Sequence, residues 1–248
     1  MAETAGARVQ GAAARTTAAG TARLAFGRGM PSLEEQDRLG EGVVDFAARL
    51  AQTFQTLMAG RMPENLQGPA HERTQEDFPN ALQALAKRRE MIYDGAAELM
   101  RARDSWIEFD RADRDGPRHH NNPLWPLDAL FGARDDVIEV GVDTIRDIST
   151  THFRVTVDLV NADELLPSGI VMPEGPLRRL RDLPTEVWLD ASGLARRIAI
   201  QNAAGNRQVW QVVEFWDFGI PVTIAPPDPS QITTPDTADL ARIFLDDT

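Results

Sequence analysis

The stretch richest in side chains that can do chemistry is Asp113-Arg114-Asp115-Gly116-Pro117-Arg118-His119-His120-Asn121-Asn122. Its two histidines and two aspartates are of the types that hold zinc or calcium. The histidines are adjacent, however, and neighbouring side chains of an extended segment point to opposite sides. The spacing also differs from the HExxH motif and from the EF-hand loop. A solvated loop is therefore favoured over a metal site, and we predict no metal.

The rest of the chain carries no enzymatic signature. It lacks the glycine-rich phosphate-binding loops and the Gly-x-Ser-x-Gly nucleophile elbow. His152 is expected on the polar face of a strand with no nucleophile to serve, so a surface histidine is the preferred interpretation. The acid pairs Asp135-Asp136 and Asp246-Asp247 are neighbours in sequence that border expected turns. We therefore predict no catalytic residue, no cofactor and no enzymatic activity.

Composition excludes further classes of function. The 248-residue chain has no cysteine, which excludes disulfides, thiolate catalysis and cysteine-ligated metals. Its net charge of −12 argues against a nucleic-acid partner and against polybasic attachment to anionic lipid. No apolar run is long enough to span a bilayer, so no transmembrane segment is predicted. No signal peptide is predicted either. The protein is then cytoplasmic or, if a leader was removed, located in the extracytoplasmic cell envelope.

Apolar residues alternate with polar ones over most of the chain, which is typical of strands with one buried face. The expected strands cover 21–26, 42–48, 51–58, 91–93, 99–103, 106–109, 137–142, 152–160, 183–190, the segment around 198–200, and 213–222. Helical spacing predicts helices at 2–18, 76–90 and 126–132, and residues 29–39 are expected to form a polar loop. Short connections favour antiparallel pairing. The predicted class is α+β, a strongly curved, mostly antiparallel β-sheet, or half-barrel, wrapped around a few helices.

The sheet rhythm breaks in two places. Residues 60–89 and 161–181 interrupt it, and we interpret them as insertions that cover the mouth of the concave side. The segment from about residue 226 onward is expected to be a loose acidic tail. With no internal repeat in the sequence, we predict that residues 1–248 form a single domain.

Two stretches near the C-terminus resemble a known family. Leu183 to Ile198 reads as strand, tight turn and strand, with Gly193 where a three-residue hairpin loop needs a left-handed residue. Val213 to Val222 is a strand that bends at Asp217-Phe218-Gly219. Together with Gly42 to Arg49, they resemble strands of the actinobacterial LppX/LprG-type lipoproteins, relatives of the LolA-like lipoprotein carriers. The sequence has no cysteine, whereas the family carries a lipid-modified cysteine at its mature N-terminus; this is a departure from the family unless that residue was removed with a leader.

This resemblance implies a function. Members of the family bind acylated lipids or lipoprotein acyl chains and move or sense them without covalent chemistry. The resemblance therefore implies that this chain is a carrier or sensor whose partner is a lipid or acylated molecule, and it leaves a protein partner unknown. The expected lining of the cavity is the apolar face of the strands: Leu24, Phe26, Val44, Phe46, Ile138, Val140, Phe153, Val155, Val157, Val187, Leu189, Ile198 and Ile200.

Two interpretations of this apolar face remain open. A filled core and a ligand cavity produce the same alternating sequence, so the alternative is a structural or interaction module of the same fold without a ligand. The tryptophans and methionines do not decide between these two interpretations. Tryptophans on predicted strands either pack in the core or stand at the rim of a cavity. Five methionines either line a cavity or fill gaps: Met58, Met62, Met91, Met100 and Met172.

Overall fold

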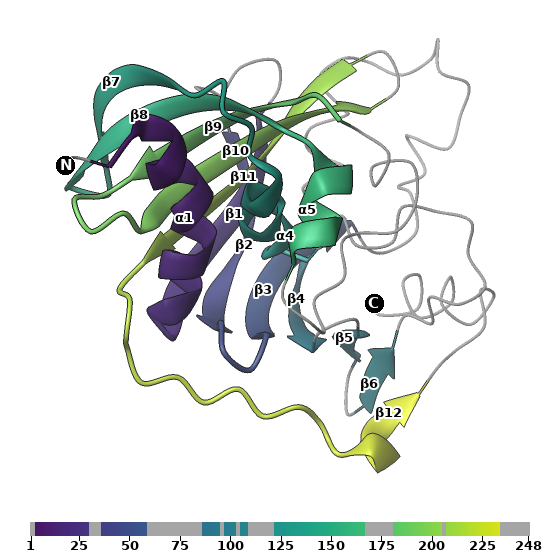
Figure 1. Ribbon diagram of the computed structural model, residues 1–248. Coiled ribbons are helices and arrows are strands. Elements are labelled where there is room, and N and C mark those ends of the chain that lie inside the picture. The colour runs from purple at the N-terminus through teal and green to yellow at the C-terminus, as the bar shows by residue number, and fades with distance from the viewer. Residues whose placement is uncertain are drawn as a thin grey trace, which may run out of the picture.

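The computed structural model describes residues 3–29, 36–58, 86–94, 97–102, 105–108, 122–166, 181–204 and 207–233. These residues form a twelve-stranded sheet that is mostly antiparallel and curves around three α-helices without closing into a barrel (Figure 1). The predicted fold class is confirmed.

The strand order places the first strand, β1, beside β11 in the middle of the sheet. The order is β12-β6-β5-β4-β3-β2-β1-β11-β10-β9-β8-β7. The strands are β1 (Thr21–Gly29), β2 (Gln36–Asp45), β3 (Leu50–Met58), β4 (Ala86–Asp94), β5 (Ala97–Ala102), β6 (Ser105–Glu108), β7 (Ile138–Ile145), β8 (Ile148–Val157), β9 (Leu183–Leu189), β10 (Ala195–Ala204), β11 (Arg207–Trp216) and β12 (Ile232–Thr233). β12 pairs with β6 in parallel, whereas the other pairs are antiparallel.

Three α-helices lie on the concave side of the sheet. They are α1 (Ala5–Ala18), α4 (Trp125–Ala129), which continues into the 3₁₀-helix η2 (Leu130–Gly132), and α5 (Leu159–Leu165). Thr4 caps α1 by accepting a hydrogen bond from the backbone N–H of Ala7 at 3.2 Å. Within the described ranges, no helix is both long and apolar enough to cross a membrane.

Two turns that the sequence predicted have the expected backbone. Gly193 adopts a left-handed φ of +76° between β9 and β10. The chain bends after β11 at Asp217 and Gly219, whose φ values are +50° and +75°. The bend is tied to the start of β1, because the N–H of Gly219 donates to the carbonyl of Thr21 at 2.8 Å.

The structure corrects three predicted segments. Residues 86–90, predicted as the end of a helix over 76–90, belong to β4, where pairing with β3 overrides the favourable placement of basic residues at a helix end. Residues 76–85 lie outside the described residues. Residues 36–39, predicted as loop, begin β2. Residues 159–165, predicted as the end of a strand and then a loop, form α5, because Asp158 caps a helix there.

The segment predicted as a loose tail includes ordered elements. Residues Pro229–Gln231 form the 3₁₀-helix η4, with Asp228 as its cap, and β12 follows at once. Residues 234–248 lie outside the described residues.

Candidate functional site

The concave face is apolar where the helices pack on it. Helix α1 presents Val9, Ala12 and Ala13, all fully buried, toward β9 and β10. Alanine on this face lets the helix axis come close to the sheet. Thr16, on the same face of α1, accepts a hydrogen bond from the backbone N–H of Ala195 at 2.9 Å. Helix α1 therefore fixes the start of β10 as well as covering this strand.

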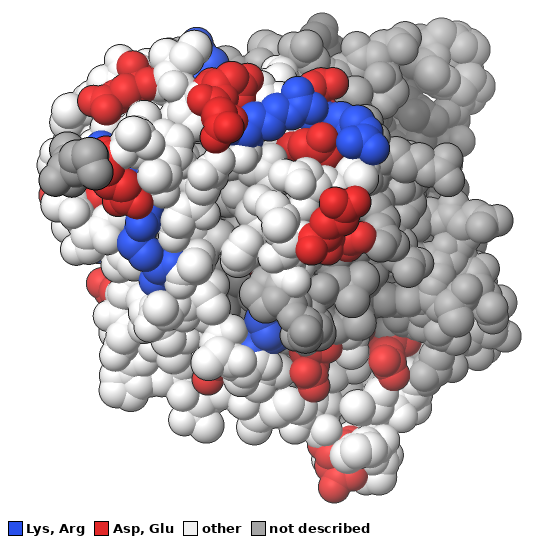
Figure 2. Space-filling model, viewed as in Figure 1, with Lys and Arg blue, Asp and Glu red and all other residues white. Residues whose placement is uncertain are grey.

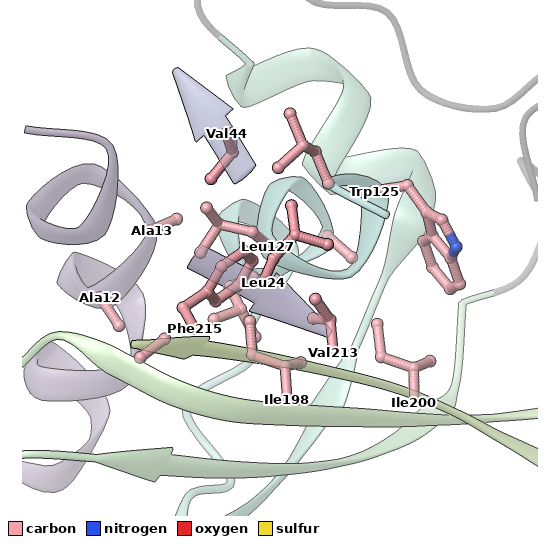
Figure 3. Close-up of a cluster of buried hydrophobic side chains, with 14 of the residues drawn as sticks. Ala12, Ala13, Leu24, Val44, Trp125, Leu127, Ile198, Ile200, Val213 and Phe215 are labelled. Atoms are coloured by element: carbon pink, nitrogen blue, oxygen red, sulfur yellow. The ribbon is translucent and has the colours of Figure 1, made fainter. Parts of the chain in front are cut away.

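The second layer of packing comes from the short helix α4. Its residues Trp125 and Leu127 are at most 3% exposed and lie in one cluster with Leu24, Val213 and Phe215 of the central strands (Figure 3). Phe46 extends this cluster, with its ring edge-on to Phe215 at a centroid distance of 5.5 Å. Together, α1, α4 and α5 fill the concave side over β1 and β8–β11. We call this region the helix-covered half.

Most of the residues predicted to line a cavity lie in this half or at its border. Ten of them are at most 2% exposed and belong to one cluster, and Phe26 packs against it partly buried. The ten are Leu24, Val44, Phe46, Phe153, Val155, Val157, Val187, Leu189, Ile198 and Ile200. The alternation therefore identified one face of the sheet, while their contact with a ligand stays a prediction.

Ile138 and Val140 do not join this cluster, contrary to the prediction. They are 58% and 47% exposed. Ile138 lies opposite Arg154 and Glu139 lies opposite Phe153, so Glu139 rather than Ile138 shares the face of the buried Phe153. A shift of register between Glu139 and Gly141, typical of a β-bulge, displaces Val140. Ile138 therefore lies on the outer face of the edge strand β7.

The concave face continues beyond the helix-covered half. In the strand register, Met91 of β4 lies opposite Met100 of β5, which lies opposite Ile107 of β6. All three are at most 1% exposed and belong to the same apolar cluster. The main strand contacts of the described helices are with β9, β10 and β11. We call the concave faces of β3–β6 the second half.

The second half also carries buried polar side chains. Thr53 and Gln55 of β3 are 0% and 4% exposed. The side-chain amide of Gln55 donates to the hydroxyl of Thr53 at 3.0 Å and also to the hydroxyl of Tyr93 on β4. The predicted methionine lining is represented here by Met91 and Met100, whereas Met62 and Met172 lie outside the described residues. Buried hydroxyl and amide groups thus sit among apolar, flexible side chains.

One buried ion pair joins the two halves. Arg49, in the turn between β2 and β3, donates to both carboxylate oxygens of Asp128 on α4, at 3.0 and 2.5 Å. Burial raises the pKa of Asp128, and the charge and hydrogen bonds of Arg49 oppose that rise. Arg49 has a left-handed φ of +57°, which is costly for a residue with a Cβ atom. The pair therefore holds a strained turn against the helix.

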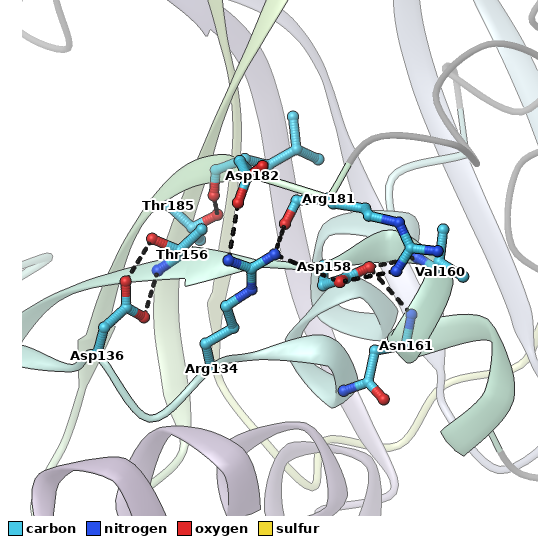
Figure 4. Close-up of polar contacts among 10 residues, drawn as sticks. Arg134, Asp136, Thr156, Asp158, Val160, Asn161, Arg181, Asp182 and Thr185 are labelled. Carbon is cyan, nitrogen blue, oxygen red and sulfur yellow. Dashed lines mark hydrogen bonds and ion pairs between the residues drawn. The ribbon is translucent and has the colours of Figure 1, made fainter.

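A second polar network anchors α5 (Figure 4). Asp158 accepts hydrogen bonds from the backbone N–H groups of Val160 and Asn161 at 3.0 and 3.2 Å. Desolvation raises the pKa of Asp158, but these N–H groups and the nearby Arg181 and Arg134 outweigh it and lower the pKa overall. The network fixes the start of α5 to the strand that precedes it.

His152 of β8 lies on the outer face of the sheet, beside the buried apolar side chain of Trp188. Its Nε2 is 2.6 Å from Glu186 and its Nδ1 is 3.2 Å from Asp143, while its ring stacks on Trp188 at 4.2 Å. Both nitrogens thus face carboxylates rather than a nucleophile. Asp135 and Asp136 bind different partners, Gln10 and Thr156 respectively, and do not face each other. Residues 109–121, which include His119 and His120, lie outside the described residues, as do Asp246 and Asp247.

A shallow hollow of about 480 Å³ also lies on the outer face. Phe54, Arg88, Arg89, Glu90 and Arg101 line it. Arg88 pairs with Glu41 at 3.1 Å and Arg101 with Glu90 at 3.0 Å. The hollow therefore has a charged lining and lies on the side of the sheet opposite the apolar cluster.

This architecture, a half-open antiparallel sheet curved around helices, matches solved structures. The Mycobacterium tuberculosis lipoprotein LppX is similar, with a TM-score of 0.51 at 13% identity over 89% of this chain and 98% of LppX. LprF of Mycobacterium bovis follows with a TM-score of 0.49, 13% identity, and coverage of 90% and 96%. A LolA superfamily protein of Nitrosomonas europaea has a TM-score of 0.30, 10% identity, and coverage of 87% and 93%.

The sequence itself matches no protein-family model and no curated protein. The chain has an LppX-like fold, as the strand motifs indicated.

Proposed function

We propose that this protein binds a hydrophobic ligand, a lipid or acyl chain, on the concave side of its sheet and acts as a non-enzymatic carrier or sensor in the cell envelope. The LppX-like fold and the resemblance to the LppX/LprG-type lipoproteins support this proposal. The observation that carries it is the extent of the apolar concave face, which runs past the described helices onto β4–β6.

We place the ligand in the second half. The ten buried residues of the predicted lining already pack with α1, α4 and α5, so they offer a ligand little room unless the helices move. Met91, Met100 and Ile107 continue the apolar surface, and Phe26 and Val44 border it from the central strands. Methionine adapts to ligands of different shape because its side chain is unbranched and polarisable. Burying each methylene of an acyl chain contributes about 0.8 kcal/mol.

The packing of the helix-covered half supports the alternative, a structural or interaction module with a filled core. Side chains there are 0–2% exposed at Leu24, Val187 and Ile198, which is the burial expected of an ordinary core. Met91, Met100 and Ile107 of the second half are equally buried, at 0–1% exposed. If protein side chains alone cover them, no ligand binds.

Native mass spectrometry of the purified protein tests the proposal first. We expect a co-purified lipid whose mass is lost after solvent extraction. The stripped protein is then titrated with a fluorescent fatty acid. Met100→Phe, which adds volume to the second half, should weaken binding at least tenfold.

Val155→Phe provides the matched control in the helix-covered half. It adds a ring where helices already pack, so it should lower the thermal stability and leave the affinity of the folded fraction within about twofold of the parent. Absence of any lipid in the parent protein, before and after incubation with fatty acid, would establish the filled-core alternative. Equal loss of binding in both variants would move the ligand into the helix-covered half.

A further inference from the structure

The chain leaves the centre of the sheet after β11 and returns at the far edge as β12. We call residues 217–233, which make this connection, the strap. Figure 1 shows the strap in yellow, running outside the sheet to η4 and β12, and Figure 2 shows the same side of the molecule in space-filling form. The strap begins beside β1 and ends on β6, and β2, β3, β4 and β5 lie between these two strands in the sheet. It therefore spans the strands of the second half.

The end of the strap near β1 is firmly anchored. The N–H of Gly219 donates to the carbonyl of Thr21 at 2.8 Å, and the hydroxyl of Thr21 donates to the carbonyl of Ile220 at 2.6 Å. The ring of Phe218 stacks against Phe46 at a centroid distance of 6.5 Å. The start of the strap thus moves with the centre of the sheet.

The middle of the strap is stiff and makes few attachments. Pro221, Pro226 and Pro227 lie in it, and proline-rich segments act as extended, semi-rigid spacers. No backbone hydrogen bond joins residues 221–227 to another described residue. Thr223 and Ala225 are exposed. The middle of the strap therefore sets a distance between its two ends without being held to the strands that it passes.

The end of the strap on β6 is its weakest attachment. β12 pairs with β6 through two residue pairs, Ile232 with Trp106 and Thr233 with Ile107. The hydroxyl of Thr233 adds a hydrogen bond to the carbonyl of Trp106 at 3.2 Å, although Thr233 is exposed. Short elements with few buried contacts open locally at a low free-energy cost. Opening of β12 is thus easier than opening of the longer strands beside it.

We propose that the strap is a latch on the second half. While β12 is paired, it holds β6 in the sheet. When β12 opens, β6 becomes the edge of the sheet, and β5 and β6, which carry the buried Met100 and Ile107, become free to move away from β4. The consequence for a ligand rests on the proposed function: opening of β12 would admit and release the lipid.

Hydrogen exchange measured by mass spectrometry tests the latch without any ligand. Ile232→Pro together with Thr233→Pro removes both N–H groups and fixes both φ angles, so β12 loses its pairing. We expect the amides of β5 and β6 to exchange about tenfold faster, and those of β9 and β10 to change by less than about twofold. Unchanged exchange in β5 and β6, or an equal increase in β9 and β10, would overturn the proposal.

The matched control places two prolines in the exposed middle of the strap. Thr223→Pro together with Ala225→Pro removes no backbone hydrogen bond to another described residue, so exchange in β5 and β6 should stay within about twofold of the parent. Thr233→Val removes only the hydroxyl bond to β6 and should give a smaller increase than the two prolines in β12. If the control pair accelerates exchange as much as the β12 pair, the pairing of β12 is not the latch.

Dissociation of a fluorescent fatty acid separates the latch from the proposed function. We expect release about tenfold faster from the variant with prolines in β12, and at the parental rate from the control. If the parent binds no fatty acid while exchange in β5 and β6 responds as expected, the proposed function is wrong and the latch stands. If the fatty acid binds and leaves both variants at the parental rate, the strap does not control the second half.

Discussion

The two halves of the concave face show how the same strand pattern serves different purposes. In the helix-covered half, small alanines on α1 and large side chains such as Phe215 interlock at 0% exposure. The second half instead combines Met91 and Met100 with the hydrogen-bonded Gln55 and Thr53. Rigid aromatic and small residues suit a fixed core, whereas methionines and polar groups suit a surface that must adapt. The difference teaches that an alternating strand specifies a buried face but not its occupant.

The largest expected difference between the halves is the loss of stability when a buried side chain is truncated. Phe215→Ala should lower the free energy of unfolding by about 3–5 kcal/mol, because the ring is fully buried against Phe46. If a ligand normally packs against Met100, Met100→Ala in the lipid-free protein should cost less than about 2 kcal/mol, the lower end for a truncated core methionine, although this side chain is 0% exposed. Urea denaturation measures both. Equal losses would indicate that the second half is an ordinary core.

Breaking the ion pair between the halves should have the next largest effect on stability. Arg49→Ala should lower stability by about 3 kcal/mol, because it leaves a buried carboxylate without its partner. Asp128 has a raised pKa in the folded protein, so the stability it contributes is present below pH 3.8 and is lost as pH rises through the folded pKa. Removing Arg49 removes the interactions that oppose this rise, and the loss should extend to higher pH.

Denaturation curves between pH 3 and pH 8 measure this dependence. The double variant Arg49→Ala with Asp128→Asn serves as the control, since it abolishes the carboxylate and should flatten the pH dependence. If the single variant has the same pH profile as the parent, the carboxylate of Asp128 is not coupled to Arg49.

The smallest expected effect is at the start of α5, on the helix side of the comparison. Asp158→Ala should lower stability by about 1 kcal/mol at pH 7, because it removes the helix cap. The lowered pKa means that Asp158 stabilises the fold above pH 3.8 and loses this contribution as pH falls through the folded pKa. The difference between variant and parent should therefore shrink in acid, opposite in sign to the behaviour of Asp128. If the stability difference between variant and parent stays constant down to pH 2, the stabilisation does not come from the ionised carboxylate of Asp158.

Local patterns predicted the sheet better than they predicted its details. The alternation at Leu183–Leu189 and the glycine at 193 sufficed for the β9–β10 hairpin, since strand and turn are both encoded within a few residues. The alternation at Ile138 and Val140 misled, because the bulge reversed which residues share the face of Phe153. A bulge has no sequence signature as clear as that of a hairpin turn.

The candidate site depended on contacts between distant residues, which a single sequence does not reveal. Arg49 and Asp128 are far apart in the chain and meet only because α4 crosses the sheet. The buried Gln55 and Thr53 appear in the sequence as ordinary polar residues of a strand. The five methionines of the sequence analysis were a signal for an adaptable lining. Their spacing alone, however, did not distinguish Met91 and Met100 from the other three.

The pairing of β1 with β11 has a consequence for how the chain acquires its shape. Leu24 faces Phe215 in the centre of the sheet, although most of the chain lies between them. Closing so large a loop costs conformational entropy before any contact repays it. Contacts of such long range are associated with slow folding. During synthesis, β1 must therefore wait until β11 has left the ribosome, with one edge exposed to misassociation in the meantime.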